Sequence, residues 1–439
     1  MQHIIPHTGE LYRRRLYNMR NCLANIFAGL ILSVCSGNYF ASTHEVGFAS
    51  LDITPGQKMI DTGEVFMGGY GFWKNRGAAE NIHDPLKASA ICISDPSNEL
   101  CVVVLDNLGL SGPICNKIRT KIHEITGIPI SKLFVAATHT HAAPDLLGLW
   151  GGSPDTYLDH LINQASRAVA EAYLDRQPAN LFYSTTQGNA YNRRGWNTTD
   201  TSITIIEALA EDGTRLGSLV NFAAHPVVSR AENRGISSDY VHYLRAHLEQ
   251  LSGAPVVYVN GAIGDVNPLE KRVINEWKVA ETYGEAIASK AFNAMLNPHA
   301  ISPGIEILTA DFTTNVDNTV LALAQFFGVL DNESSGPPWN IALNSRVGKF
   351  RLGNEVEAVI VPGEALTRLG KEIKAEMTTP VKLFFGLTGG SLGYLIPPDE
   401  WETGRNNNYE ESVSLGKHIG YQIRDLLTSL RFEPAAKLD

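Results

Sequence analysis

The chain has 439 residues, of which 44% are hydrophobic and 19% are charged. This length and composition are typical of a folded globular protein with a substantial core, and they exclude a disordered or fibrous chain. The 46 acidic residues outnumber the 36 basic ones, and the net charge is −10. That balance argues against a broad phosphate-binding face, so nucleic acid is not expected as a partner.

Residues 1–41 have the pattern of an export signal. Arginines at positions 13, 14, 15 and 20 precede a short apolar run over residues 23–34, and small residues follow the run. The run is shorter than the roughly 20 apolar residues of a membrane-spanning helix. We therefore predict a periplasmic or secreted protein. The alternatives are a lipid anchor at Cys35, an uncleaved N-terminal anchor, and translation that starts at Met19.

Three of the five cysteines lie beyond this segment, namely Cys92, Cys101 and Cys115. Their spacing does not match that of a metal-binding finger, and their number is odd. One disulfide is conceivable. The interpretation that we favour is three buried thiols on strands of the core.

No repeat, linker or low-complexity tract interrupts residues 47–431, so we predict one domain over residues 42–439. Apolar runs typical of buried strands alternate with amphipathic helical patterns. The predicted strands are 100–105, 133–137, 218–222, 256–259, 357–361 and 382–387, and the predicted helices are 114–125, 157–173, 240–251, 279–295 and one from 365 onward. This alternation predicts an α/β fold with mixed, partly parallel sheets flanked by helices.

Polar clusters follow four of the predicted strands. They are THTH at 138–141, AAHP at 223–226, GDVNP at 264–268 and PGE at 362–364. In open α/β sheets, ligands bind at the carboxyl ends of strands, because the loops there vary while the sheet holds them rigidly. We therefore expect the four clusters to lie close together.

The side chains in these clusters suit a metal site. His139, His225 and Glu364 offer two imidazoles and a carboxylate, which is the ligand set of a catalytic zinc ion with a position left for water. His141 lies two residues after His139, so one ring could bind the metal while the other handles protons. Each histidine taken alone could instead be a hydrogen-bonded structural residue.

Ten segments together resemble the catalytic domain of the neutral, non-lysosomal (neutral/alkaline) ceramidases. They occur in the family's order and cover nearly all of the chain after the export segment. The segments are GFASLDITP (47–55), MGGYG (67–71), IHDPLKASAI (82–91), THTHAAPD (138–145), NRR (192–194), NFAAHP (221–226), SSDY (237–240), NGAIGDVNP (260–268), PGEALTRLGKEI (362–373) and YE (409–410).

The resemblance implies a zinc ion bound by four side chains, which are His139, His225, Glu364 and Tyr409. It places His141 beside the water that the metal activates, Arg193 near the scissile group, and Tyr394 as a donor to the carbonyl oxygen. It also implies hydrolysis of the N-acyl amide bond of ceramide or a related lipid amide, with a membrane surface as a further partner. No stable protein partner is predicted.

Two departures from the family's pattern bear on this expectation. Where the family has a serine that has been proposed as a nucleophile, this chain has Asn267, which cannot accept an acyl group. Catalysis would then rest on metal-activated water, with Asn267 orienting the substrate. No counterpart of the family's C-terminal immunoglobulin-like domain is expected after residue 430. The alternatives are a zinc hydrolase of another amide or ester, and a non-catalytic exported binding protein.

Several residues near the motifs have two interpretations. Asp239 and Asp265 either orient the histidines or act in caps and turns. Tyr70, Phe72 and Trp73 could line an acyl groove, although core packing is the interpretation that we favour. The glycine-rich stretch 386–393 lacks a phosphate-loop lysine and predicts a tight loop that presents Tyr394.

Overall fold

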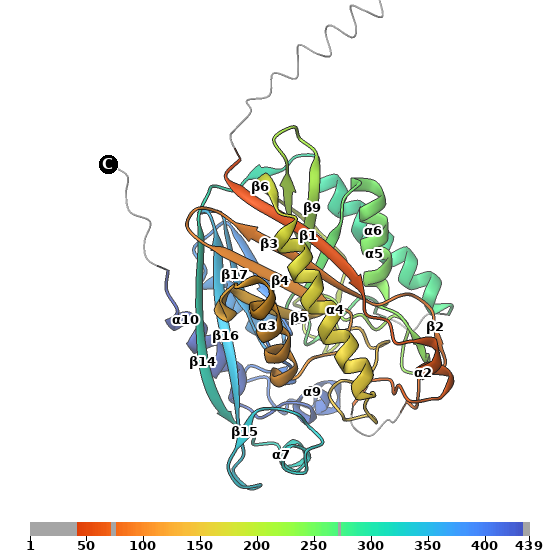
Figure 1. Cartoon of the computed structure of the whole chain (residues 1–439). Helices are drawn as coiled ribbons and strands as arrows, with labels where there is room; N and C mark the ends of the chain where they lie inside the picture. Colours follow the sequence, from red (N-terminus) through yellow and green to blue (C-terminus); the bar gives the residue numbers. More distant parts are fainter. Residues whose placement is uncertain (1–41, 72–75, 271–273, 433–439) are drawn as a thin grey trace, which may run out of the picture. The chain divides into compact units, whose positions relative to one another are not determined.

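The computed structural model describes residues 42–71, 76–270 and 274–432 (Figure 1). The predicted export segment, together with Phe72 and Trp73, lies outside the described residues. Ser42–Asp439 group into one unit. None of the helices within the described ranges has the length and hydrophobicity that crossing a bilayer requires.

The first sheet follows the order β11-β9-β8-β6-β1-β3-β4-β5, and β13 pairs with β6. Most neighbouring strands are antiparallel, whereas the pairs β4–β5 and β9–β11 are parallel. The strands are β1 (His44–Asp52), β3 (Lys87–Ser94), β4 (Glu99–Leu105), β5 (Leu133–Ala137), β6 (Gln177–Gln187), β8 (Ser202–Leu209), β9 (Arg215–Phe222), β11 (Val256–Asn260) and β13 (His299–Ala300).

The second sheet has the order β14-β16-β17-β19, with β15 beside β16 and a parallel pair β17–β19. Its strands are β14 (Ile305–Asn315), β15 (Ser334–Ser335), β16 (Ala342–Leu352), β17 (Val356–Ile360) and β19 (Val381–Phe385). Three short pairs complete the strands of the described part: β2 (Asn81–Ile82) with β10 (Gly235–Ile236), β7 (Tyr191–Asn192) with β12 (Val266–Asn267), and β18 (Glu364–Ala365) with β20 (Tyr394–Leu395).

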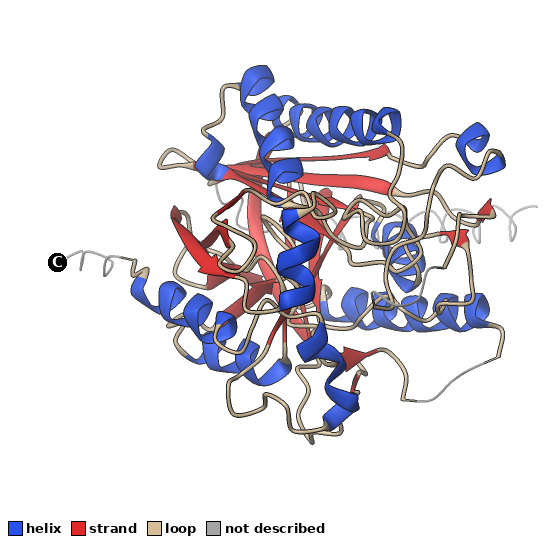
Figure 2. Ribbon diagram, turned by 90° about the horizontal axis from the view of Figure 1, so that it is seen from below, coloured by secondary structure: helices blue, strands red, loops and turns tan. Residues whose placement is uncertain are grey.

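Helices cover the outer faces of the sheets (Figure 2). Some have clear boundary signals: Ser111 caps the start of α3 through its hydroxyl, and Gly127 ends that helix with a φ of 78°. The helices are α2 (Gln57–Asp61), α3 (Gly112–Thr126), α4 (Asp155–Leu174), α5 (Tyr240–Ser252), α6 (Glu276–Ala294), α7 (Thr319–Phe326), α8 (Thr367–Ala375), α9 (Tyr409–Ser412) and α10 (Ile419–Ser429), with 3-10 turns η1 (Ile130–Lys132) and η2 (Arg405–Asn408).

The core lies on both faces of the sheets. Alternate residues of β11 show this arrangement: Val257 and Val259 join the central cluster between the sheets, while Val256 and Tyr258 pack outward against α5 and α6. The helices α3 and α4 cover the outer face of β3 to β5, and α8 and α10 cover that of the second sheet. Because both faces are buried, these strands are apolar runs without polar alternation.

The predicted mixed α/β fold is confirmed, and each predicted strand and helix is present with small shifts of its ends. The expectation of three buried thiols is wrong. Cys92 on β3 and Cys101 on β4 are directly opposite each other and form a disulfide, while Cys115 is a free buried thiol. Spacing along the chain did not reveal this pairing, because it depends on the register of the two strands.

The polar clusters meet for a different reason from the one that the sequence suggested. Along the first sheet, five strands separate β5 from β9, so their carboxyl ends are not neighbours in one parallel sheet. The sheets instead fold over the central core. The Asn260 side chain, at the end of β11, donates to the carbonyl oxygens of Ala137 and Thr138 at the end of β5, at 3.2 and 2.6 Å. The backbone carbonyl of Asn260 accepts from the backbone N–H of Gly386, just past β19.

A buried ion pair joins this region to α5. Arg245 Nη2 lies 2.5 Å from Asp106 Oδ2 beyond the end of β4, and both side chains are almost fully buried. The same carboxylate oxygen accepts from the backbone of Lys87.

We expect Arg245→Ala to lower the free energy of unfolding by about 3–5 kcal/mol, because it leaves the Asp106 carboxylate buried without its cation. The matched control is Arg167→Ala, whose pair with Glu171 on α4 is exposed and should contribute less than about 1 kcal/mol. Urea unfolding followed by circular dichroism measures both. Equal effects of the two substitutions would contradict this account of the pair.

Candidate active site

Two histidines are held in one orientation by backbone carbonyls. His139 follows β5 in a left-handed conformation with a φ of 63°, and its Nδ1 lies 2.5 Å from the Leu108 oxygen. His225 follows β9, and its Nδ1 lies 3.0 Å from the Val266 oxygen. Since a carbonyl oxygen can only accept, each Nδ1 carries the proton, and each Nε2 of a neutral ring presents a lone pair.

Both of these lone pairs face one carboxylate. Glu364 Oε2 lies 3.1 Å from His139 Nε2 and 3.0 Å from His225 Nε2. All three side chains are buried. With neutral rings, three acceptors would face one another without a proton between them, which is unfavourable away from water. A metal cation among them removes that conflict, because all three atoms are suitable ligands.

His141 is close enough to belong to the same group. Its Nε2 lies 3.3 Å from His139 Nε2, and the ligand atoms of His139, His141 and His225 all lie within 4.8 Å of one another. In a tetrahedral site with bonds of about 2.0–2.1 Å, neighbouring ligand atoms lie about 3.3 Å apart. The distances of 3.0 to 3.3 Å in this cluster therefore fit a metal ion.

Protonation of the cluster is consistent with this geometry. Burial lowers the pKa of His225 to about 4, and the positive charge of Arg193 acts in the same direction. Burial also takes the pKa of His141 well below its usual value, with the neighbouring histidines adding to the effect. Burial alone would raise the pKa of Glu364, but a positive charge on His139 or His225 outweighs it and holds that pKa well below its usual value. Neutral rings and an ionised carboxylate are the forms that bind metal.

Arg193 connects the cluster to a buried ionic network. Its Nη2 donates to the Tyr394 hydroxyl at 2.9 Å and to the Gly264 oxygen at 2.7 Å, and its Nε pairs with Glu410 at 2.8 Å. Burial opposes the charge of Arg193, but Tyr394 and Glu410 raise its pKa above the usual value. Arg193 therefore remains a cation fixed 3.5 Å from His225 Nε2.

Tyr394 is placed beside Glu364 by backbone pairing, since the two residues are opposite each other in the short pair β18–β20. The positive φ values of Gly389, Gly390 and Gly393 show the turns of the loop that precedes it. Burial raises the pKa of Tyr394 well above its usual value, although Arg193 opposes this. Its hydroxyl therefore keeps its proton and can donate it in a hydrogen bond.

The other two predicted site residues lie differently. Tyr409 lines the same cavity as His139 and Glu364, its ring is centred 6.0 Å from that of Tyr394, and burial raises its pKa to about 12. Asn267 lies on β12 and is not among the residues that line this cavity. Its Oδ1 is buried without a hydrogen-bond partner in the described part of the chain. The roles assigned to the predicted site residues stay predictions.

Asp239 and Asp265 act as caps and turn residues. Asp239 accepts from the backbone of Tyr240 at the start of α5 and from Ser229. Asp265 accepts from the backbone and hydroxyl of Thr367 at the start of α8, and from the Asn192 amide. Neither carboxylate has a described hydrogen bond to a histidine, because backbone carbonyls hold the rings. Asp265 also positions Arg193, whose backbone N–H donates to the Asp265 carbonyl at 2.7 Å.

Two contacts that support the site were missed by reasoning from sequence. The buried Arg76 guanidinium donates to the carbonyl oxygens of His141 and Gly68, which ties the segment 67–71 to the segment 138–141. Gly69 passes so close to His141 that a Cβ at Gly69 would lie 2.4 Å from Nδ1 of that ring. The MGGYG segment was recognised, but its pattern does not reveal that it packs on the histidine.

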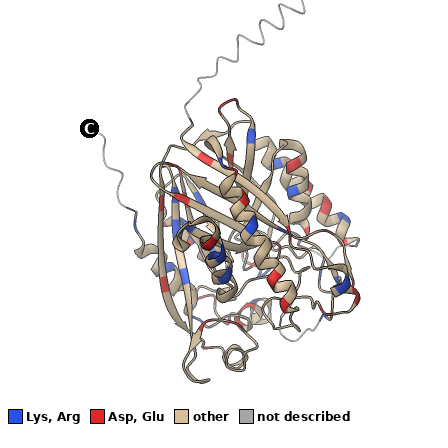
Figure 3. Ribbon diagram, in the orientation of Figure 1, with Lys and Arg blue, Asp and Glu red and all other residues tan. Residues whose placement is uncertain are grey.

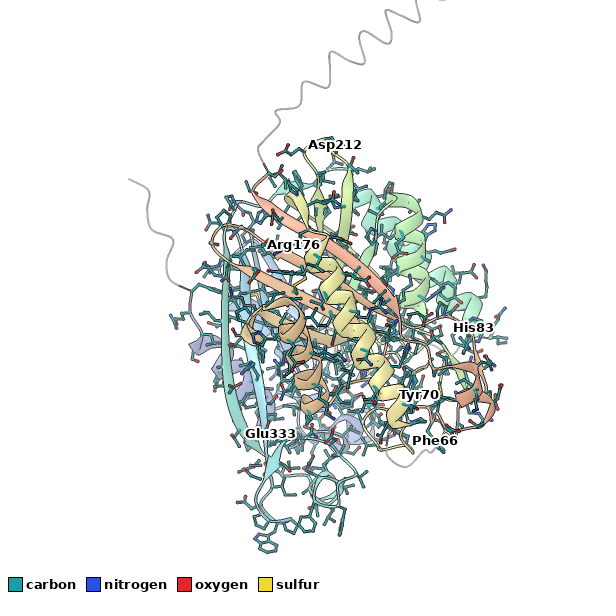
Figure 4. The ribbon with its side chains drawn as sticks, viewed as in Figure 1. Phe66, Tyr70, His83, Arg176, Asp212 and Glu333 are labelled. Carbon is teal, nitrogen blue, oxygen red and sulfur yellow. A yellow bond between two sulfur atoms is a disulfide. The ribbon has the colours of Figure 1, made fainter. Side chains whose placement is uncertain are left out.

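A cavity of about 810 Å³, part of it open to solvent, adjoins the cluster. His139, His141, Glu364, Tyr394 and Tyr409 line one part of it. Tyr70, labelled in Figure 4, also lines it, and its ring lies 4.6 Å from that of His141. The remaining lining is largely apolar and includes Leu108, Leu147, Leu149, Trp150, Leu321, Leu330, Leu343, Leu392, Val413 and Leu415.

No protein-family model matches the chain, and no curated protein sequence matches it either. The fold has counterparts among solved structures. The neutral ceramidase of Pseudomonas aeruginosa superposes with a TM-score of 0.75 at 17% identity, covering 90% of this chain and 76% of that one. A ceramidase complexed with C2 gives a TM-score of 0.72 at 17% identity, covering 90% and 77%. The chain thus has the fold of these ceramidases.

The geometry predicts one divalent metal ion per chain, bound by the histidine cluster. We expect His139→Ala and Glu364→Ala to weaken zinc binding more than about 100-fold, because losing only an outer partner of a ligand costs about 10- to 100-fold. Titration calorimetry and elemental analysis of the purified protein measure this effect.

His141→Ala separates the two roles open to that residue. If the His141→Ala variant binds zinc almost normally, the role left for His141 is proton transfer. If it loses zinc binding as His139→Ala does, His141 is a metal ligand. The control is His160→Ala, because His160 is an exposed histidine on α4. Absence of stoichiometric metal from the unmodified protein would contradict the site.

Proposed function

We propose that the protein is a zinc-dependent hydrolase that cleaves the N-acyl amide bond of ceramide or a related lipid amide. The observation that carries this proposal is the buried cluster of His139, His225 and Glu364, of which His139 and Glu364 line a largely apolar cavity. The fold of the neutral ceramidase from Pseudomonas aeruginosa supports it.

The donor set favours zinc over the hard cations. Magnesium and calcium prefer oxygen ligands, whereas imidazole nitrogens with one carboxylate are typical of zinc. When bound here, zinc would supply a water of lowered pKa and polarise the substrate carbonyl. Tyr409 would add a fourth ligand, at the cost of losing a proton that is held with a pKa of about 12.

Tyr394 and Arg193 would stabilise the negative charge that develops on the carbonyl oxygen. The Tyr394 oxygen accepts from Arg193 at 2.9 Å, so its own proton is free to point into the cavity that it lines. A fixed donor of this kind needs little reorganisation when charge forms. The Arg193 cation polarises the hydroxyl further, and Glu410 and the Gly264 oxygen hold Arg193 in place.

His141 would move the proton. Its ring is neutral and buried, and its Nδ1 has no hydrogen-bond partner among the described residues. A neutral imidazole beside the reacting atoms can take a proton from the attacking water and deliver it to the leaving amine. The close approach of Gly69 would fix the plane of the ring.

The apolar part of the cavity would hold an acyl or sphingoid chain. Its leucines come from several elements, including Leu108 beyond β4, Leu321 on α7 and Leu343 on β16. Burying hydrocarbon against them provides binding energy of about 0.8 kcal/mol for each CH₂ group. A substrate with one amide and long chains matches this division between polar and apolar walls.

Another amide or ester remains the second candidate substrate, and Asn267 is the residue that favours it. It stands where the family has serine, and it does not line the cavity as a nucleophile would.

We also propose that the protein is exported. The disulfide between Cys92 and Cys101 supports this, because such bonds persist mainly in oxidising compartments.

We expect the purified protein to release fatty acid from ceramide, to lose this activity in a chelator and to regain it with added zinc. Liquid chromatography with mass spectrometry measures the products. Parallel assays with short soluble amides and esters distinguish the two substrate classes. Hydrolysis of these compounds without ceramide hydrolysis would overturn the lipid proposal, and chelator-resistant activity would overturn the zinc proposal.

Gly69→Ala should lower kcat for the preferred substrate by roughly 100-fold, since a misplaced general base loses about that factor. The added Cβ would meet His141 Nδ1 and displace the ring. The matched control is Gly127→Ala, which also replaces a glycine of positive φ but has open space around it. If both variants kept normal kcat, Gly69 would have no role in positioning His141.

A further inference from the structure

Exposed apolar side chains are concentrated in one short segment. Of the thirteen large hydrophobic side chains that are exposed in the described part of the chain, six lie between residues 320 and 339. Phe327 and Trp339 are the most exposed of these, at 73% and 85%. We call the six residues the α7 surface: Val320, Leu323, Phe326, Phe327, Val329 and Trp339.

The helix α7 is apolar on both faces. Leu321 and Ala322 are buried against the second sheet, while Val320, Leu323 and Phe326 point to solvent. A helix that is hydrophobic all round is normally covered on both sides. Figure 1 shows α7 and β15 at the lower end, beyond the main sheets, and Figure 4 shows side chains there that project away from them, with Glu333 labelled nearby.

The same segment forms part of the wall of the candidate active site. Leu321 on α7, and Leu330, Asp331 and Asn332 after it, line the cavity that contains His139 and Glu364. The α7 surface is therefore the outer side of an element whose inner side faces the cavity. Whatever covers the α7 surface lies beside the space in which a substrate would bind.

Charge around the segment favours an uncharged partner. The sequence has no lysine or arginine from residue 291 to residue 345, and Asp317, Asp331 and Glu333 flank the apolar positions. Figure 3 shows α7 without a charged residue. Anionic headgroups would be repelled here, because attraction to such surfaces relies on basic residues. Exposed Phe and Trp side chains, in contrast, are typical of segments that enter the interfacial region of a bilayer.

We propose that the α7 surface docks on a lipid bilayer of zwitterionic composition by inserting its apolar side chains. In the docked state the lipid surface covers the unpartnered face of α7 and lies next to the cavity wall. The choice of a bilayer as the occupant rests in part on the proposed function, because a lipid amide is itself dissolved in membranes. The contact is hydrophobic, so it does not weaken when salt is added.

The experiment uses the full chain and vesicles of phosphatidylcholine with bromine-labelled acyl chains, which quench nearby tryptophan fluorescence. The apolar run within residues 1–41 could also bind vesicles, so the readout is the difference between the unmodified protein and Trp339→Phe. We expect the vesicles to quench the tryptophan fluorescence of the unmodified protein more than that of Trp339→Phe. This difference should persist at high salt.

Phe327→Glu should lower the affinity for vesicles by about tenfold or more, because one large apolar side chain no longer enters the lipid. This affinity is measured from the quenching of Trp339. The matched control is Leu174→Glu. Leu174 is 75% exposed at the end of α4, and its substitution should leave that binding within about twofold.

Three results would overturn the proposal: no quenching of Trp339, quenching that requires anionic lipid and disappears with salt, or equal effects of Phe327→Glu and Leu174→Glu. Dimerisation in lipid-free buffer that Phe327→Glu abolishes, without Trp339 quenching by vesicles, would assign the surface to a second copy instead. His139→Ala should dock normally. If the unmodified protein docks but does not hydrolyse ceramide, the docking proposal stands and the proposed function fails.

Discussion

The site depends on one electrostatic constraint, in which two imidazole nitrogens and a carboxylate oxygen point at one another. Backbone carbonyls of Leu108 and Val266 fix the tautomers of His139 and His225, so neither ring can turn its proton toward Glu364. Such an arrangement is stable only if a cation or an extra proton lies among the three atoms. The surrounding hydrogen bonds therefore leave these three atoms as a group that could hold a metal cation.

The cavity beside this group bears on the kind of substrate that we propose. Its polar wall contains His139, His141, Glu364 and Tyr394, and leucine is the most frequent residue in the rest of its lining. A soluble metabolite would leave that apolar wall in contact with water, whereas a lipid amide covers it. The same wall continues outward into α7, so the proposed docking surface and part of the cavity wall belong to one structural element.

The sequence predicted most of the fold and the cluster itself. Strands buried on both faces, such as β5 and β11, are apolar runs that sequence patterns detect well, and His139, His225 and Glu364 indeed meet. The sequence missed longer and partly exposed strands such as β14, whose pattern is less marked. It also could not predict contacts set by register or by packing of distant loops, which include the Cys92–Cys101 disulfide and the approach of Gly69 to His141.

Asn260, at the end of β11, joins the ends of β5 and β19: its side-chain amide donates to Ala137 and Thr138, and its backbone carbonyl accepts from Gly386. The strands β5 and β11 lie at opposite edges of the first sheet, and β19 belongs to the second. The residues that would bind metal follow β5, β9 and β17, and they are spread along the chain from His139 to Glu364. A fragment or a partly folded chain would therefore have no preformed site. Contacts between such distant segments form slowly, so metal uptake should occur late in folding. The ion would then stabilise the completed fold and would not nucleate it.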